Sequence, residues 1–368
     1  MKLVMAGGGT GGHLFPALAL AEEFRRRDSS AEIIFVGARG GLEEKVVPKY
    51  GYELRLFNVE GIKRRSAARR AVAVFKAAGA TLRAVSMLRA LKPDGVIGSG
   101  SYSSAPVVFA ARVLGIKTAI LEQNALPGLT NKVLGRVVMK IYIAFPEARG
   151  FFPASRTVLS GNPLRRQLLE KLAAKGGGKD AGGNGRDEKF TVFVFGGSQG
   201  ATAINAAFLD SLEYLADIGA GIRIIHQTGE EGFHLAEAAY RRKKIKAGIY
   251  RFIDDMAGAY AASDLVVCRA GATSIAEITA FGLASVLVPY PFAADDHQTV
   301  NAKSLEKAGA ATVVSQDKLT GRTLADAIRR YYADRAFLKS VSAASRSLGR
   351  PDAAGIIADD FTKVLGRG

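Results

Sequence analysis

The stretch GGGTGGHLFPALALAEEF, residues 7–24, places a histidine directly after a run of glycines. Glycines allow a tight turn and let a ligand approach the backbone N–H groups at the start of a helix. His13 stands where that helix should begin, and the helix macrodipole there disfavours a protonated ring. A neutral imidazole at this place can accept a proton from a hydroxyl group, or it can only position the substrate. The spacing is close to G-x-G-x-x-G, which is a weak motif alone, so a turn without a ligand is the alternative.

Other polar side chains follow predicted strands, where α/β sheets usually bind their ligands. In LEQNALPGLTNK, the amides of Gln123 and Asn124 can hydrogen-bond sugar hydroxyls. Arg165 in GNPLR follows a proline turn and can pair with a phosphate. Glu277 in CRAGATSIAEITAFG can accept two ribose hydroxyls, or it can complement the helix macrodipole. The turn GSGSYSSAP, residues 98–106, is either a phosphate-binding turn or a plain loop.

The sequence lacks the motifs of several other classes of enzyme and of metal sites. The sequence has no D-x-D, no H-E-x-x-H and no cysteine cluster, so we expect no required metal and no cofactor, with weak magnesium assistance left open. Asp254 and Asp255 are adjacent acids of the kind that are usually solvated or cap a helix. A G-x-S-x-G elbow and a P-loop are absent, which argues against a serine hydrolase and a P-loop kinase. The one cysteine, Cys268 in DLVVC, is predicted to be a thiol in a buried strand.

Alternating strand-like and helical segments must position these residues. A chain of 368 residues favours two domains, and the Gly-rich, charged segment 173–189 lies near a boundary. FTVFVFGGSQGATAINAAFL then repeats the strand, glycine turn and helix of the N-terminus. We therefore predict an α/β protein with two doubly wound domains whose parallel sheets face each other across a cleft, an arrangement that suits an enzyme joining two substrates. The predicted strands are KLVMA, EIIFVG, LRLFN, GVIGS, KTAILE and KIYIAF in the first half, and FTVFVFG, IRIIHQT, IYRFI, DLVVC and SVLVPY in the second.

The formal net charge of +17 favours an anionic partner. Residues 61–92 hold nine Lys or Arg and no acid, and apolar positions 72, 75, 79, 82 and 85 approximate one helical face. Two interpretations stay open: a helix that lies on an anionic membrane surface, and an outer helix with a solvated basic face. Nucleic acid is disfavoured because no zinc-finger spacing or RNP-like motif accompanies the charge. We expect a cytosolic protein, since no secretory signal is seen and no apolar run reaches the ~20 residues of a spanning helix.

Six sequence blocks together carry a family resemblance: GGGTGGHLFPALALA, LEQNALPGLTNK, GNPLR, FGGSQGA, FIDDMAGAYAASDLVVCRAGATSIAEITAFG and HQTVNA…LEKAGAA. In this set and order, the chain resembles the MurG family of bacterial N-acetylglucosaminyltransferases over nearly its whole length. The resemblance implies the GT-B fold, with an N-terminal acceptor and membrane-associating domain of residues 1–161, a UDP-sugar-binding domain of residues 162–347, and a terminal helix, 348–368, that packs back on the first domain.

The resemblance also implies an activity. Members of the family are inverting hexosyltransferases that move N-acetylglucosamine from UDP-N-acetylglucosamine to the C4 hydroxyl of undecaprenyl-pyrophosphoryl-N-acetylmuramoyl-pentapeptide, with UDP as the second product. This is a step of peptidoglycan synthesis, on which cell-wall biogenesis, cell shape, cell division and the cell cycle depend. The implied place is the cytoplasmic face of the inner membrane, as a peripheral protein, with an anionic membrane surface and other cell-wall synthesis proteins as partners and no nucleic acid.

Matched position by position, the family pattern assigns contacts to UDP-N-acetylglucosamine, whereas His13 is the candidate catalytic residue on the helix-terminus argument given above, with a positioning role as the alternative. Ser101 departs from the family pattern, which usually has glycine there. Asp296 and His297 receive no role, and the Gly-rich insertion 176–186 is peculiar to this chain. The implied contacts are Thr10, Gly11 and Gly12 at the donor sugar and acceptor, Asn124 at the donor sugar, Arg165 and Ser198 near the pyrophosphate, Ile253 at uracil, Ala272, Thr273, Ser274, Ile275, Ala276 and Glu277 around uridine, and Gln298 at the sugar hydroxyls.

Two other functions remain open at this point. One is another GT-B glycosyltransferase that acts on a membrane lipid, such as a galactosyl-diacylglycerol synthase. The other is a catalytically silent sugar-nucleotide-binding scaffold of the cell-wall machinery. A silent scaffold would be expected to have lost His13 or Glu277, and the sequence keeps both.

Overall fold

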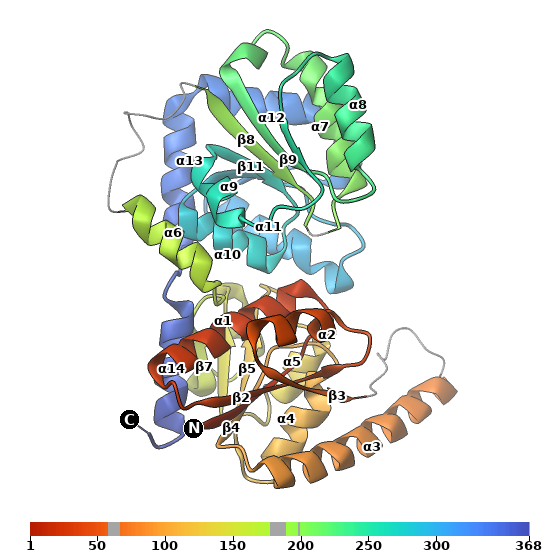
Figure 1. The fold of residues 1–368 in the computed structure, drawn as a ribbon, viewed down its shortest axis with the longest axis vertical. Helices are drawn as coiled ribbons and strands as arrows, with labels where there is room; N and C mark the ends of the chain where they lie inside the picture. The colour runs from red at the N-terminus through yellow and green to blue at the C-terminus, as the bar shows by residue number, and fades with distance from the viewer. Residues whose placement is uncertain (58–66, 177–188, 198, 368) are drawn as a thin grey trace. The chain divides into compact units, whose positions relative to one another are not determined.

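The computed structural model describes residues 1–57, 67–176, 189–197 and 199–367, which form two compact units (Figure 1). The first unit contains Met1–Arg166 and Pro351–Gly368, and the second contains Gln167–Arg350. Each unit has one parallel sheet covered by helices, so the α/β class with two doubly wound sheets is confirmed. These divisions of the chain lie close to the boundaries predicted after residues 161 and 347.

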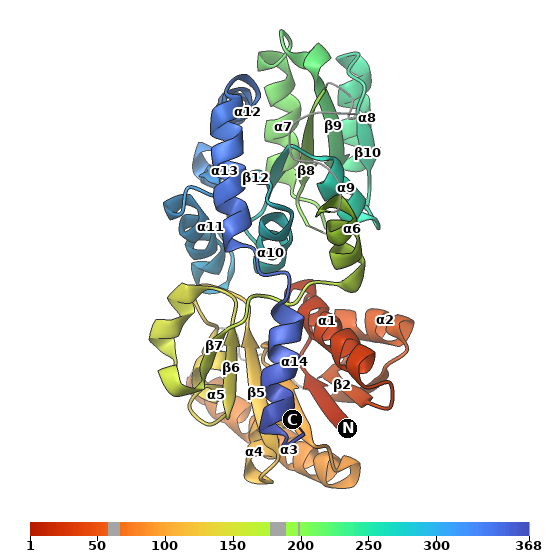
Figure 2. The same cartoon turned by 90° about the vertical axis from the view of Figure 1, so that its left-hand side faces the viewer.

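The sheet of the first unit is buried on both faces. Its strand order is β3-β2-β1-β4-β5-β6-β7, with all neighbours parallel. In β1, Leu3 and Met5 face the core shared with α1 and α14, while Val4 and Ala6 face the core shared with α3 and α4 (Figure 2). Apolar residues on both faces are typical of strands in a parallel sheet. The elements are β1 (Lys2–Ala6), α1 (Gly11–Arg27), β2 (Glu32–Ala38), α2 (Leu42–Val46), η1 (Val47–Tyr50), β3 (Glu53–Phe57), α3 (Ala67–Leu91), β4 (Gly95–Gly98), α4 (Ser104–Val113), β5 (Lys117–Glu122), α5 (Leu129–Leu134), β6 (Lys140–Ile143), η2 (Pro146–Phe151), η3 (Ala154–Arg156), β7 (Thr157–Leu159) and α14 (Ala353–Val364).

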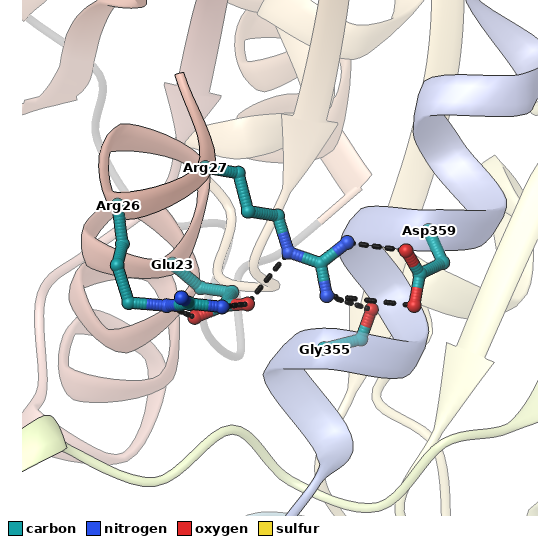
Figure 3. A network of polar contacts seen from close by, with 5 residues as sticks. All are labelled: Glu23, Arg26, Arg27, Gly355 and Asp359. Atoms are coloured by element: carbon teal, nitrogen blue, oxygen red, sulfur yellow. Dashed lines mark hydrogen bonds and ion pairs between the residues drawn. The ribbon is translucent and has the colours of Figure 1, made fainter. Parts of the chain in front are cut away.

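Helix α14 returns to this first unit from the far end of the chain. Ile357 and Phe361 are fully buried in the core that also contains β1 and α1. At the surface, Arg27 at the end of α1 donates to the carboxylate of Asp359 and, at 3.2 Å, to the carbonyl oxygen of Gly355 (Figure 3). Burial of apolar side chains and these polar contacts together hold α14 against α1.

The second unit repeats the plan with the strand order β10-β9-β8-β11-β12-β13, again parallel throughout. Phe190, Val192 and Val194 of β8 pack in one core with α7, α8 and α12. The elements are α6 (Arg166–Gly176), β8 (Phe190–Phe195), α7 (Thr202–Tyr214), η4 (Gly219–Gly221), β9 (Ile222–Gln227), α8 (Phe233–Arg242), β10 (Gly248–Tyr250), α9 (Met256–Ala262), β11 (Leu265–Cys268), α10 (Ala272–Phe281), β12 (Ala284–Leu287), η5 (Ala294–Asp296), α11 (His297–Lys307), β13 (Thr312–Val313), η6 (Gln316–Lys318), α12 (Gly321–Ala333) and α13 (Arg335–Leu348).

Helix α3 follows the apolar face that the sequence pattern indicated only in part: Val85 is partly buried against the core, and positions 72 and 75 lie outside the described side chains. Among its described side chains, Ala80, Ala84 and Leu88 are buried, and Ala84 and Leu88 lie in one core with residues of α4. Leu82, which the pattern placed on the apolar face, is 71% exposed. Ala80, Ala84 and Leu88 follow one another at four-residue spacing and therefore share one face of the helix, and Leu82 lies off that face.

His226 makes the stability of the second unit depend on pH. The ring is fully buried in β9, with Nδ1 2.9 Å from the Tyr240 hydroxyl and Nε2 3.2 Å from Asn205 Oδ1. Burial lowers its pKa to about 3, whereas an unfolded histidine titrates near ~6.5. As the pH falls from about 6.5 toward about 3, the unfolded chain therefore binds a proton that the native chain does not, and stability is lost.

We expect the free energy of unfolding to fall by about 1 kcal/mol between pH 7 and pH 5.5 through this group alone. Urea unfolding of the full chain at the two pH values measures the difference. His226→Gln keeps a polar side chain without the titration and should remove most of the difference. An equal loss of stability in wild type and variant would contradict the assignment.

Candidate active site

A buried carboxylate holds the glycine loop that follows β1. Glu43 on α2 is fully buried and accepts the backbone N–H groups of Gly9, at 2.7 Å, and Ala38, at 2.8 Å. A Cβ atom on Gly8 would overlap this carboxylate, so only glycine fits there. The sequence analysis missed Glu43, because nothing in the sequence around an acid of a short helix indicates that its carboxylate will accept an N–H group of a distant loop.

His13 lies on the first turn of α1 and contacts the ends of two neighbouring strands. Its Nδ1 atom is 2.9 Å from the carbonyl oxygen of Ser99, after β4, and 3.1 Å from Oε1 of Gln123, after β5. A carbonyl oxygen can only accept a hydrogen bond, so Nδ1 carries the hydrogen. In the neutral ring the basic lone pair is then on Nε2, which is the atom that could take a proton from a substrate.

Gly100 leaves the space in which the His13 ring lies. Its φ is +93°, and a Cβ atom built there would stand 2.8 Å from His13 Nδ1. The next residue, Ser101, has φ +72°, a left-handed conformation that favours glycine. Its hydroxyl lies 2.8 Å from that of Ser103, so a local side-chain contact accompanies the strained backbone at the position where the sequence departs from the family pattern.

These loops meet where the strand order of the first sheet reverses, between β1 and β4. Ligands of open α/β sheets bind at this kind of switch point. Thr10 is the N-cap residue of α1, and Gly11 and Gly12 form its first positions. Thr10 and Gly12 are exposed and Gly11 is half-buried, so the start of the helix is accessible to a ligand.

A second buried acid shapes the loop that contains Asn124. Glu122, at the end of β5, accepts the backbone N–H of Asn124 at 2.9 Å, that of Gly128 at 3.2 Å, and the side-chain amide of Asn131 at 2.9 Å. Burial raises the pKa of Glu122, and these donors act in the opposite direction. Asn124 itself is half-buried beside the His13 loops. The sequence analysis quoted Glu122 without assigning it a role.

Arg165 lies against the helix that carries His13. Its guanidinium group is 5.2 Å from the centre of the Phe15 ring, two residues after His13. By its contacts Arg165 belongs to the first unit, although the predicted boundary placed it in the second domain. An arginine at this distance from an aromatic ring makes a favourable cation–π contact.

In the second unit, Gln227 links two loops to which the sequence analysis assigned nucleotide contacts. The side chain is 2% exposed; its Nε2 donates to the Gly197 carbonyl at 2.9 Å, and its Oε1 accepts the Ile253 N–H at 2.9 Å. The predicted pyrophosphate contact Ser198 lies outside the described residues. Gln227 was missed because it ends a strand, where an amide has no distinctive sequence context.

Residues Ala272–Glu277 form the first two turns of α10. Glu277 is in the second turn, which makes a purely macrodipole role less suitable, since that effect is confined to the first turn. Its Oε2 accepts the Tyr260 hydroxyl at 2.9 Å, and the residue is 5% exposed. Ala272 and Ile275 are buried, whereas Thr273, Ser274 and Ala276 are half-buried.

Gln298 supports the neighbouring loop through its side chain. Its Oε1 accepts the Tyr290 N–H at 3.0 Å, from a half-buried position at the start of α11. Asp296, just before the helix, accepts the Thr299 hydroxyl at 2.6 Å. The second unit therefore carries Ile253, Glu277 and Gln298 on separate loops and helices that its own sheet supports.

Two predictions about other groups can be compared directly with the structure. Cys268 is fully buried, which raises the pKa of its thiol, so the prediction of a core thiol is confirmed. Asp255 caps α9 by accepting the Gly258 N–H at 2.9 Å, which confirms the capping interpretation for this acid. Within the part of the chain that the structure describes, no cluster of three His, Cys, Asp or Glu side chains could hold a metal ion.

Family models, relatives and a solved structure that resemble this chain all point to the same family of glycosyltransferases. Residues 3–143 match the glycosyltransferase family 28 N-terminal domain, and residues 191–356 match the family's C-terminal domain. A UDP-N-acetylglucosamine--N-acetylmuramyl-(pentapeptide) pyrophosphoryl-undecaprenol N-acetylglucosamine transferase of Syntrophus aciditrophicus is 48% identical, over 99% of both chains. The enzyme of the same name from Myxococcus xanthus is 46% identical over 98% of this chain and 92% of its own length. The crystal structure of Acinetobacter baumannii MurG is 32% identical, with a TM-score of 0.79 over 98% of this chain and 99% of its own.

Proposed function

The chain belongs to the MurG enzymes of glycosyltransferase family 28, and we propose on that premise that it transfers N-acetylglucosamine from UDP-N-acetylglucosamine to undecaprenyl-pyrophosphoryl-N-acetylmuramoyl-pentapeptide. The observation that carries the proposal is the 48% identity to a transferase of this name over 99% of both chains. The fold is GT-B, and the chain is a hexosyltransferase of peptidoglycan synthesis. The products are the lipid-linked disaccharide and UDP.

The residues of the second unit bind the donor nucleotide in this proposal. Glu277 accepts the ribose hydroxyls, the loop at Ile253 reads the uracil edge, and Gln298 contacts the sugar. The Ile253 N–H already donates to Gln227, so its carbonyl oxygen is the group suited to accept from the base. The half-buried Thr273, Ser274 and Ala276 and the buried Ala272 and Ile275 form the wall beside uridine. Ser198 and, from the first unit, Arg165 are the proposed contacts of the pyrophosphate.

The residues of the first unit bind the acceptor and carry out the proton transfer. His13 is the general base: its Nε2 takes the proton of the acceptor's C4 hydroxyl as that oxygen attacks the anomeric carbon. The bond from this carbon to the UDP oxygen breaks on the opposite face, and the configuration inverts. Thr10, Gly11, Gly12 and Asn124 line the sugars beside His13.

A transfer assay tests the activity. Radiolabelled UDP-N-acetylglucosamine and a short-chain analogue of the lipid acceptor should yield a labelled disaccharide product. UDP-galactose serves as the competing donor, and product mass distinguishes the two sugars. Transfer of galactose with equal efficiency would favour another GT-B lipid glycosyltransferase, and UDP-sugar binding without any transfer would favour the silent scaffold.

We also propose that the first unit binds the cytoplasmic face of the inner membrane as a peripheral protein. Several large apolar side chains are exposed on α3, α4, α5 and η2, and α4 packs against both α3 and α5. Basic residues accompany them, with Lys132 4.8 Å from the centre of the Phe151 ring. No helix among the described residues has the length and apolar character to span a bilayer. This α3–α5 surface is made of Leu82, Phe109, Val113, Leu129, Val133 and Phe151, with Arg83, Arg89, Arg112, Lys132, Arg136 and Arg149.

Replacing Arg69, Arg70 and Lys76 of α3 with Glu should release the protein from anionic vesicles. Each basic residue near such a surface contributes about 1 kcal/mol, so the triple variant should bind about 100-fold more weakly at ordinary salt. Vesicle sedimentation measures the binding. Turnover on a soluble acceptor analogue should be preserved, because these residues lie outside the proposed active site.

The second unit provides a control with the same change in charge. Arg241 and Arg242 at the end of α8 and Lys246 after it are exposed. Their replacement by Glu should leave vesicle binding nearly unchanged if the α3–α5 surface makes the contact. Equal release by both triple variants would mean that vesicle binding depends only on net charge. If the α3 variant were not released, the basic residues of α3 would form a solvated face that does not contact the membrane.

A further inference from the structure

The amide of Gln123 lies against His13 and not where the sequence analysis expected a sugar contact. The residue directly follows β5 and is 2% exposed. Its Nε2 donates to the Ser99 carbonyl at 2.9 Å, and its Oε1 is 3.1 Å from His13 Nδ1. A buried amide whose two ends are both occupied is not free to turn toward a sugar hydroxyl.

The carbonyl oxygen of Ser99 fixes the direction of both side chains. Because it can only accept, His13 Nδ1 and Gln123 Nε2, each 2.9 Å away, must both donate to it. The amide oxygen of Gln123 then faces His13 Nδ1 and shares the same hydrogen. Turning the amide over would place two oxygen acceptors together and two N–H groups together, so the observed orientation is the one that satisfies every group.

We propose that Gln123 is a positioning residue that holds the His13 ring in its Nδ1–H tautomer, with Nε2 as the proton acceptor. The part that concerns catalysis rests on the proposed function, whereas the tautomer is a property of the ligand-free chain. In the reaction the proton moves from the C4 hydroxyl to Nε2 as the new bond forms at the anomeric carbon, and UDP leaves with the electron pair of the broken bond. The ring becomes a cation, and Gln123 Oε1 continues to accept from Nδ1–H.

The ionisable groups on the elements around His13 have hydrogen-bond or ring partners of their own, whereas the side chain of Gln123 beside the ring is uncharged. Glu43 on α2 supports the Gly9 loop, Glu122 at the end of β5 supports the Asn124 loop, and Arg165 lies over Phe15 on α1. Both acids accept backbone N–H groups of their own loops. A neutral amide orients the ring without favouring its cation, which a carboxylate at the same place would do.

The test replaces Gln123 with Glu in the full chain. A carboxylate beside Nδ1–H should raise the pKa of His13 by about 1–2 units, since an opposite charge at this range favours the protonated ring. ¹⁵N NMR of histidine-labelled protein reads the tautomer and the titration, with His13→Ala identifying the signal among four histidines. The acidic limb of the kcat profile should move upward by the same amount, and in a His13→Ala background the second change should cause no such movement.

Gln123→Met removes the acceptor while keeping the length of the side chain. Because only the Ser99 carbonyl then accepts from Nδ1–H, we expect the Nε2–H form to become detectable beside the Nδ1–H form in its spectrum. We expect kcat to be lower by about five- to tenfold, the size of one neutral hydrogen bond, with little change in donor KM. A wild-type ring with its hydrogen on Nε2, or an unchanged titration in Gln123→Glu, would overturn the proposal. A shifted titration with an unmoved kcat limb would support the positioning role and instead remove the base role from His13.

Discussion

Replacing His13 with alanine is expected to lower kcat by 10²–10⁴-fold while KM for UDP-N-acetylglucosamine changes little. This range is the usual contribution of a positioned general base. The donor KM should be preserved because the proposed nucleotide contacts Ile253, Glu277 and Gln298 belong to the second unit, and His13 to the first. Steady-state kinetics with a soluble acceptor analogue, at saturating concentrations of each substrate in turn, separate the two parameters.

The pH profile gives a second measurement on the same variant. A protonated ring cannot accept the hydroxyl proton, so the wild-type kcat should fall on the acidic side, and the variant should lose that limb. His234→Ala is the control, because His234 is exposed on α8 in the other unit. A His13→Ala variant with near-normal kcat, or with the acidic limb retained, would leave His13 as a turn residue that positions substrate.

Replacing Glu277 with alanine is expected to weaken UDP binding and to raise the donor KM, each by about 10²–10⁴-fold. Two ribose hydroxyls would lose a charged acceptor, and a hydrogen bond to a charged group contributes about 1.5–3 kcal/mol. Calorimetry with UDP and with 2′-deoxy-UDP provides the decisive comparison. The wild-type protein should prefer UDP, and the variant should bind the two ligands almost equally.

Tyr260→Phe separates the role of the carboxylate from that of its support. The change removes the hydroxyl that donates to Glu277 Oε2 at 2.9 Å but leaves the carboxylate in place. We expect a loss of UDP affinity below tenfold, about the effect of one hydrogen bond. If Glu277→Ala kept full discrimination against the deoxy ligand, another residue would hold the ribose.

The sheets could be predicted because parallel strands are buried on both faces and stand out as apolar runs. Each of the eleven predicted strands is present, within a few residues at its ends. Two short strands, β7 (Thr157–Leu159) and β13 (Thr312–Val313), were missed. Both lie at the edge of a sheet and are half-buried, so their sequences lack the apolar run that reveals a central strand.

The site could be predicted only for residues that belong to a motif. His13, Asn124 and Glu277 stand in blocks whose glycines and order are distinctive, and their proposed ligand contacts remain predictions. Glu43 and Gln227 also hydrogen-bond to the glycine loops, but each is distant from its loop in the sequence. Gln123 was noticed, but its partner Ser99 is 24 residues away, so its direction depends on how β4 and β5 pair. Contacts of this kind follow from the folded topology and not from local sequence.

The return of α14 to the first unit has a consequence for synthesis on the ribosome. Residues 351–368 emerge only after the whole of 167–350, yet they complete a core that begins with β1. At ordinary rates of translation, roughly 5–20 residues per second, the surface that Ile357 and Phe361 later cover stays open for tens of seconds. The first unit therefore begins to be synthesised first but completes its folding last. A nascent chain stalled before Pro351 presents an apolar groove that chaperones, or the α14 of a neighbouring chain, can occupy.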